Sequence, residues 1–245
     1  MGLSSTQYSS NQPQGFGGSI YRDLSHVVRV AGKDIRLEVR SKAITIATLF
    51  FAILVLVILA FAIGPSEQFL RNGAAGALWV ALAFAGVTAA SQSYQHELED
   101  GAFEQLLLYP APRTTLFLGK LIANWCFMIV LALVLTPLCS ALFGMQITAH
   151  VVWLALTIVL GTLGFALIGT FYAALTANLR ARESLLPVLM LPIVVPVLLA
   201  AVSATGEIVQ LGNLGLAQDW LRLLAGFDLI YLVVCSSLYT VVVEE

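Results

Sequence analysis

Charged residues are scarce in this sequence. They make up 11% of its 245 residues, whereas a soluble domain of this length carries about 25%. This shortage excludes an ordinary soluble domain, because too little polar surface would face water. The composition instead suits a lipid bilayer, because 59% of the residues are hydrophobic. These residues gather in runs of about 20, the length of a helix that crosses a bilayer. We therefore expect an all-α, polytopic membrane protein.

Cysteine and histidine are also sparse, and neither residue type forms a metal-binding pattern. The cysteines lie inside apolar runs without a CxxC pair, so neither a disulfide framework nor a zinc site is indicated. The histidines are too scattered to share a metal. Only His150, at the outer end of the fourth run, could face a ligand, and an interfacial histidine without a special role is the favoured interpretation. The cysteines are Cys126, Cys139 and Cys235, and the other histidines are His26 and His96.

The residues of an ATP-binding or proton-coupled machine are missing as well. There is no GxxxxGK[ST] phosphate loop; the nearest string, Gly119-Lys120-Leu121, lacks both the hydroxyl for magnesium and the upstream glycine. No catalytic constellation is present, so we predict that this chain is not an enzyme. The spans carry no series of ionisable residues either. The best candidate, Asp228, is predicted near the start of the sixth span and close to Arg222, which argues against a proton-coupled secondary transporter.

Six apolar runs are long enough to cross a membrane. With the N-terminus in the cytoplasm, ten of the twelve lysines and arginines lie on the cytoplasmic side, and only Arg71 and Arg222 lie outside. This distribution follows the positive-inside rule and returns the C-terminus to the cytoplasm. The loop before the sixth run, 205–223, is apolar, and it can dip into the bilayer or lie on its surface. The runs are residues 44–63, 74–92, 121–142, 151–176, 185–204 and 224–242.

Two segments precede the first span. Residues 1–20 are rich in serine, glutamine and glycine, so we expect a disordered tail before a single membrane domain at 21–245. Residues 22–42 repeat apolar residues on one helical face and basic residues on another. This pattern predicts an amphipathic helix in the membrane interface, with a simple basic flank as the alternative. The apolar positions are Leu24, Val28, Ala31, Ile35 and Val39, and the basic positions are Arg29, Lys33, Arg36 and Arg40.

Small residues and prolines mark the packing inside the spans. Small residues recur at every fourth position of the second and fourth spans, which allows close helix approach. Proline removes an N–H group and crowds the carbonyl four residues back, so the fifth span is expected to bend or break. That bend can be a static packing feature or a moving element. The small-residue ridges are Gly73, Ala77, Ala81, Ala85 and Ala89, and Thr162, Ala166, Thr170 and Ala174; the prolines are Pro187, Pro192 and Pro196.

The segment "HELEDGAFEQLLLYPAPRTTLFLGK" lies between the second and third spans. As a helix over 97–109 it has an apolar stripe and an acidic stripe; Gly101 weakens it, and Pro110 and Pro112 end it. Anionic lipid headgroups repel acids, so the pattern favours docking on a cytoplasmic partner protein over a helix on the membrane surface. The apolar stripe is Phe103, Leu106 and Leu107, and the acidic stripe is Glu97, Asp100 and Glu104.

This segment resembles the permease subunits of ABC-2-type transporters through the pattern E-x-x-x-G-x-x-E-Q-L-L-x-x-P-x-x-R followed by GK. Together with "LLPVLMLPIVVPVLLAA" and "WLRLLAGFDLIYLVV", it is similar to the CcmB family, the haem-exporter permeases of cytochrome c maturation, over residues 25–243. The Ser/Gln/Gly tail departs from the family pattern. The resemblance implies that Glu97, Gly101, Glu104 and Pro110 belong to a coupling helix that docks on a separate ATP-binding subunit.

The resemblance also implies a larger assembly in a bacterial inner membrane. It would hold two permease chains, two copies of the ATP-binding component A, and the haem-handling components C and D, and would act with a periplasmic haem chaperone, component E. ATP would bind to the partner and haem would be the possible cargo, with no cofactor bound directly by this chain and no nucleic acid involved. Whether haem itself crosses this chain stays open. The alternatives are an ABC-2 permease for a drug, lipid or glycan, and a secondary transporter or scaffold without an ATPase.

Overall fold

The computed structural model describes residues 26–36, 42–92, 113–145, 147, 150–176 and 182–242. These residues contain no strand, which confirms the all-α prediction, and six of their helices are long and apolar enough to cross a membrane. The predicted tail at 1–20 lies outside the described residues. The helices are α2 (Lys42–Ile63), α3 (Glu67–Gln92), α6 (Arg113–Phe143), α7 (Val151–Thr176), α8 (Arg182–Gly206), the short π-helix η1 (Glu207–Leu211) and α9 (Leu214–Val242), preceded by a helix at 26–36.

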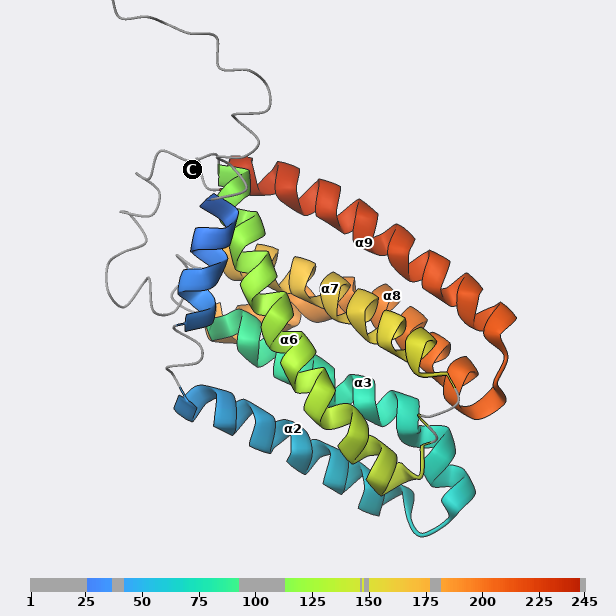
Figure 1. Ribbon diagram of the computed structural model, residues 1–245. Helices are drawn as coiled ribbons and strands as arrows, with labels where there is room; N and C mark the ends of the chain where they lie inside the picture. Colours follow the sequence, from blue (N-terminus) through green and yellow to red (C-terminus); the bar gives the residue numbers. More distant parts are fainter. Residues whose placement is uncertain are drawn as a thin grey trace, which may run out of the picture.

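The helices run side by side and turn at two ends of the bundle (Figure 1). The basic end holds the helix at 26–36, the beginnings of α2, α6 and α8, and the ends of α3, α7 and α9. The far end holds the α2–α3 turn, the end of α6, and η1. Arg71 and Arg222 are on the halves of their helices that lead to the far end, so the described basic residues separate as the sequence predicts.

The centre of the bundle is made by α3 and α7. Half or more of the most apolar stretch of each is buried, 61% in α3 and 50% in α7, against 17% in α2 and 22% in α9. Both predicted ridges lie in this centre: Ala77, Ala81 and Ala85 are buried on α3, and all four members of the α7 ridge are buried. The small residues therefore act in helix packing, as their spacing predicts.

Glycines let large rings enter between the central helices. A Cβ atom at Gly86 of α3 would lie 2.5 Å from Cε1 of Phe165 on α7, and one at Gly161 of α7 would meet the ring of Trp79 on α3. The Trp79 indole also donates a hydrogen bond to the Thr205 hydroxyl of α8, at 2.9 Å. Each ring is thus seated against a backbone that has no side chain of its own, and Trp79 joins three helices.

Two polar contacts hold α6 against α7. The Asn124 side-chain amide donates to the Thr170 hydroxyl at 3.2 Å, and the Trp125 indole donates to the Thr162 hydroxyl at 3.2 Å. Both threonines belong to the α7 ridge. Polar groups that have no water to bond must find partners inside the bundle, so these residues add specificity to a contact that is otherwise made by small apolar side chains.

The prolines of α8 do not interrupt it. The helix is continuous from Arg182 to Gly206, so of the two expected outcomes the break is wrong, while the bend stays a prediction. Pro192 is exposed and the other two prolines are half-buried, whereas the core-facing side of α8 carries leucine, methionine, valine and alanine. The Tyr231 hydroxyl of α9 donates to the Ile193 carbonyl at 3.0 Å, next to the carbonyl of Pro192 from which Pro196 removes the N–H donor.

The prediction of an outer loop at 205–223 is wrong as well, because most of these residues are helical. η1 continues α8 to Leu211, and only Gly212 and Asn213 separate it from α9. Gly212 has a φ of 61°, a left-handed conformation that glycine adopts at low cost, and the Asn213 side chain accepts a hydrogen bond from the Leu216 N–H at 3.3 Å. The apolar residues that looked unusual for a loop are therefore the first turns of a helix.

Asp228 lies deep in the bundle, and not near the start of its span as the sequence predicted. Because α9 begins at Leu214, residues 214–227 precede Asp228 and 229–242 follow it, so it lies midway along the helix rather than near its start. Arg222 is bonded to Asp219, at 3.0 Å, and not to Asp228.

Candidate functional site

The predicted coupling segment is attached to the basic end of the bundle on both sides. Its proposed contact residues, from Glu97 to Pro110, lie outside the described residues. The helices that flank them are described: α3 ends at Gln92 and α6 begins at Arg113, both at the basic end (Figure 1). A force applied to the segment would therefore reach α3 and α6 first.

The helix at 26–36 docks on α6 close to this attachment. Its contact centres on Gly119 of α6, where a Cβ atom would lie 2.7 Å from Cβ of Val30 and 3.2 Å from the carbonyl oxygen of Val27. Only glycine allows the two backbones to come this close. Val27 and Ala31 are both buried in the contact surface of the helix.

An ion pair fixes the same contact. Lys120 follows Gly119, and its side chain is only 1% exposed. Its Nζ lies 3.3 Å from Oδ2 of Asp34 on the docked helix, while Nζ of Lys33 lies 3.1 Å from Oδ1 of the same carboxylate. A charge that is buried this completely is costly unless it is paired, so Lys120 makes the position of the helix at 26–36 specific as well as close.

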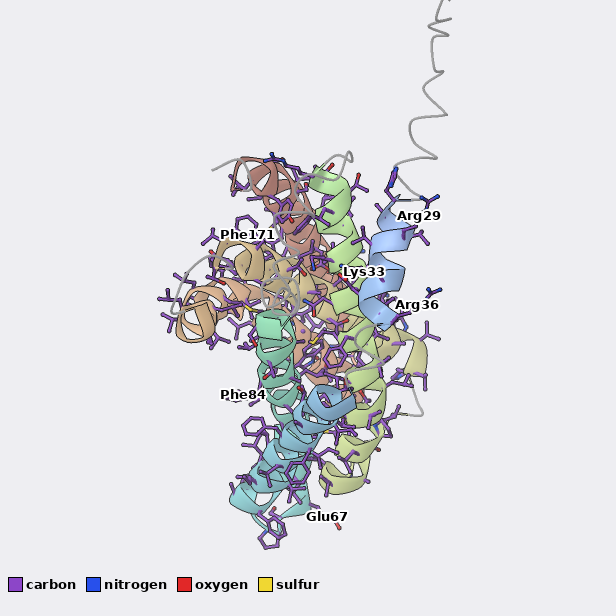
Figure 2. All side chains as sticks on the ribbon, turned by 90° about the vertical axis from the view of Figure 1, so that its left-hand side faces the viewer. Arg29, Lys33, Arg36, Glu67, Phe84 and Phe171 are labelled. Atoms are coloured by element: carbon purple, nitrogen blue, oxygen red, sulfur yellow. The ribbon has the colours of Figure 1, made fainter. Side chains whose placement is uncertain are left out.

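The docked helix has three faces, where the sequence predicted two. Val27, Val30, Ala31 and Asp34 face α6. Val28, which was assigned to the apolar face with Ala31, is 63% exposed, so the apolar face turns partly away from the bundle, as a helix in the membrane interface requires. Arg29 and Arg36 form the third face, and Figure 2 shows them pointing away from the bundle, whereas Lys33 is paired with Asp34. The amphipathic helix is confirmed over 26–36, with this additional docking face.

The end of α9 completes the site. The ring of Tyr239 lies 5.2 Å, centre to centre, from that of Phe117 on α6, and both side chains are fully buried. Phe117 comes just before the Gly119-Lys120 pair in the helical stripe that packs inward. The first turns of α6 are therefore held by the docked helix through Gly119 and Lys120 and by α9 through Phe117, directly after the proposed coupling segment.

Comparison with known proteins identifies a family that covers most of this chain. The family model described as "CcmB protein" matches residues 25–243. This chain belongs to the CcmB family.

Individual relatives share the family over most of their length. "Heme exporter protein B" of Rhodobacter capsulatus is 31% identical over 195 residues, which cover 79% of this chain and 87% of that one. The protein of the same name from Pseudomonas aeruginosa is 33% identical over 167 residues, covering 68% and 74%. That of Escherichia coli K12 is 34% identical over 177 residues, covering 72% and 80%. With its six apolar helices, this CcmB-family chain is a multi-pass membrane protein.

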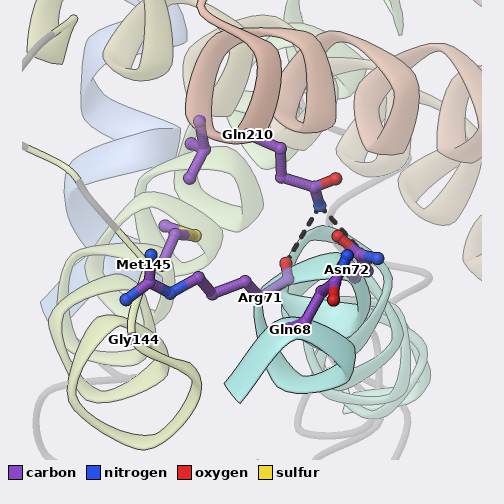
Figure 3. Close-up of a pocket in the computed structure, with 7 residues that line it drawn as sticks. Gln68, Arg71, Asn72, Gly144, Met145 and Gln210 are labelled. Atoms are coloured by element: carbon purple, nitrogen blue, oxygen red, sulfur yellow. Dashed lines mark hydrogen bonds between the residues drawn. The ribbon is translucent and has the colours of Figure 1, made fainter. Parts of the chain in front are cut away.

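The far end of the CcmB-family bundle carries a small polar pocket (Figure 3). The Gln210 side chain of η1 donates to the carbonyl oxygens of Arg71 and Asn72, at 3.0 and 3.1 Å. The cavity has a volume of about 190 Å³, and pockets for drug-sized molecules have about 300–1,000 Å³, so it cannot enclose a large cargo. Its lining residues are Gln68, Arg71, Asn72, Gly144, Met145, Val209 and Gln210.

Sequence reasoning missed the pairing of Lys120 with Asp34. It treated Lys120 as part of an incomplete phosphate loop, as one of the cytoplasmic basic residues and as the end of the family pattern. A usable signal was present, because Lys120 shares a helical face with Phe117 and Asn124, both buried in α6. A lysine among buried positions requires an acid, and Asp34 is the one acid within the helix at 26–36, although Asp23 and Glu38 also belong to the amphipathic segment.

Proposed function

We propose that this chain is the transmembrane permease subunit of an ABC transporter for cytochrome c maturation, coupled to haem export or to release of the haem-loaded chaperone. The match to the CcmB family over residues 25–243 carries this proposal, together with relatives that are named "Heme exporter protein B". A separate ATP-binding subunit hydrolyses ATP, since the sequence has no phosphate loop of its own.

In this proposal the chain lies in a bacterial inner membrane, and the basic end of its bundle faces the cytoplasm. Ten of the twelve lysines and arginines then lie on the cytoplasmic side, where anionic lipids attract the exposed basic face of the helix at 26–36. The far-end pocket opens to the periplasm, and the α2–α3 turn lies on the same side. Two permease chains, two copies of the ATP-binding component A, and the haem-handling components C and D form the assembly. The haem chaperone, component E, is met on the periplasmic side.

The mechanism starts at the coupling segment. Closure of the two ATP-binding subunits moves residues 97–110, and with them the first turns of α6. Because Gly119 and Lys120 lock α6 to the helix at 26–36, and Phe117 packs on Tyr239, these elements move together as one unit. Coupling of this kind needs an element with two arrangements that both sites bias, and α8, with its three prolines, is the proposed element.

The test is a charge reversal in the coupling segment. Glu104→Lys is expected to abolish co-purification of an ATP-binding protein while the chain stays in the membrane. The matched control is Glu67→Lys, which makes the same change at a side chain 87% exposed at the far end and should leave co-purification intact. Wild-type recovery of the ATP-binding protein with Glu104→Lys, or its absence from wild-type preparations, would overturn the proposal.

The cargo is tested separately by deletion of the gene. All c-type cytochromes should be lost and then restored by the wild-type gene. Normal c-type cytochromes in the deletion strain would exclude cytochrome c maturation and leave an ABC-2 permease with another cargo.

A further inference from the structure

Asp228 lies on the inward-facing side of α9, where the other buried side chains are uncharged and mostly apolar. The inward-facing side of α9 has helical spacing and is buried along its length, and Asp228 is itself only 5% exposed. No charged residue shares this stripe. Its other buried members are Ala217, Leu221, Leu224, Cys235 and Tyr239.

The carboxyl group of Asp228 points at the middle of α7. A Cβ atom at Gly164 would collide with its Oδ1 and would also lie 3.0 Å from Cγ1 of Val197 on α8. The three residues therefore meet at one place, about midway along each helix. Neither carboxyl oxygen of Asp228 has a hydrogen-bond partner in the described part of the chain.

No other ionisable group in the described helices bonds to this carboxyl group. On α7 the one ionisable side chain is Tyr172, about two turns from Gly164 toward the basic end. On α8 only Arg182 and Glu183 are ionisable, and both are in its first turn. On α9 itself, Asp219 pairs with Arg222 and Tyr231 bonds to a backbone carbonyl. Cys235 and Tyr239 of α9 lie about two and three turns from Asp228 toward the basic end. The remaining ionisable residues on elements that touch α9 are Arg113, Lys120, Cys126 and Cys139 on α6 and Glu207 on η1.

A negative charge at this place would have neither a counter-ion nor a donor. An unpaired ionised carboxylate inside a membrane bundle is strongly unfavourable, whereas a neutral carboxyl group is tolerated far better. Gly164 leaves room for the carboxyl group without offering it a partner. The packing of α9 on α7 is therefore compatible with the protonated group and opposes the ionised one.

We propose that Asp228 is an intramembrane proton-binding site. The protonated carboxyl group lets α9 pack on α7 at Gly164, and release of the proton requires α9 to separate from α7 so that water reaches the carboxylate. The site takes up and releases one proton and makes or breaks no other bond. The inference is independent of the cargo and of the ATP-binding subunit.

Infrared spectroscopy of the purified full-length chain in lipid nanodiscs tests the protonation directly. The wild type should show the C=O stretch of a neutral carboxylic acid at pH 7, shifted by exchange into heavy water, and Asp228→Asn should lose it. Asp219→Asn is the matched control on the same helix, and its exposed, paired carboxylate should leave the band unchanged. A wild-type spectrum without this band, or a band that persists in Asp228→Asn, would overturn the proposal.

The coupling to helix separation is read at Cys235, a buried thiol two turns further along the same stripe. Its maleimide labelling should rise more steeply with pH in the wild type than in Asp228→Asn, because only the wild type gains a charge that pushes α9 away. Cys139, buried on α6 against the Ala74 carbonyl, should respond alike in both proteins. Asp228→Leu provides a second neutral variant. Equal pH profiles at Cys235 in the wild type and in the neutral variant would refute the coupling.

Discussion

Gly119→Ala is the sharpest perturbation of the contact between the helix at 26–36 and α6. The new Cβ would lie 2.7 Å from Cβ and Cγ1 of Val30, whereas carbon atoms in contact are about 3.5–4.0 Å apart. Rotation of the Val30 side chain cannot relieve the clash, because Cβ moves only with the backbone. The docked helix must therefore retreat by about 1 Å.

The retreat also reaches the ion pair. If the helix moves by about 1 Å, the 3.3 Å distance between Lys120 and Asp34 grows to about 4.3 Å, beyond the range of a contact ion pair. Overpacking costs about 1–3 kcal/mol and a weakened buried donor about 1–3 kcal/mol, against about 1 kcal/mol gained in helix propensity. These terms leave a net loss of about 1–5 kcal/mol in docking, and a loss of about 2 kcal/mol, within that range, raises the undocked population about 30-fold.

Limited trypsin digestion in nanodiscs measures that population. Arg29, Lys33 and Arg36 are cleavage sites on the docked helix, and cleavage follows the open population when opening is fast. The matched control is Gly32→Ala, the same substitution on the docked helix at a position with no atom within 4 Å, and it should cut at the wild-type rate or more slowly. Equal cleavage of Gly119→Ala and Gly32→Ala would refute the proposed role of Gly119.

Two further predictions concern the bundle. Gly86→Ala should lower the melting temperature, with a loss of about 1–3 kcal/mol from the clash with Phe165, whereas Gly76→Ala on the same helix, with no atom within 4 Å, should be neutral or stabilising; equal melting temperatures would contradict the packing. Pro192→Ala should leave assembly and membrane insertion intact, because Pro192 is exposed, yet uncouple ATP hydrolysis from cytochrome c yield, and an unchanged yield would reject α8 as the moving element.

Hydropathy predicts the spans well where a helix is apolar to its ends. α7 coincides with the predicted span because its first and last residues are valine and threonine with no charge between them. α3, α6 and α9 begin earlier than predicted, because Glu67, Arg113 and Asp219 interrupt the apolar runs while leaving the helices intact. Charge marks the edge of the hydrocarbon region, whereas hydrogen bonding decides where a helix begins.

The coupling segment, unlike the spans, rests on the sequence alone. Its acidic and apolar stripes, and its likeness to a coupling helix, come from the sequence, and Glu97 through Pro110 remain predictions because they lie outside the described residues. What the structure adds is the contact made by the helix that follows: Gly119 and Lys120 of α6 are bound to a helix that lies far away in sequence.

By itself the sequence determined that this is a membrane protein, how many spans it has, that its basic residues separate to one end, and how its small residues are spaced. Each of these features follows from local composition and from the helical period. Only the tertiary structure decided that Lys120 is buried against Asp34, that Gly119 and Gly164 are contact points, and that Asp228 stands unpaired in mid-bundle. These facts depend on which helices become neighbours, and side chains far apart in the chain acquire their environment only when the helices pack.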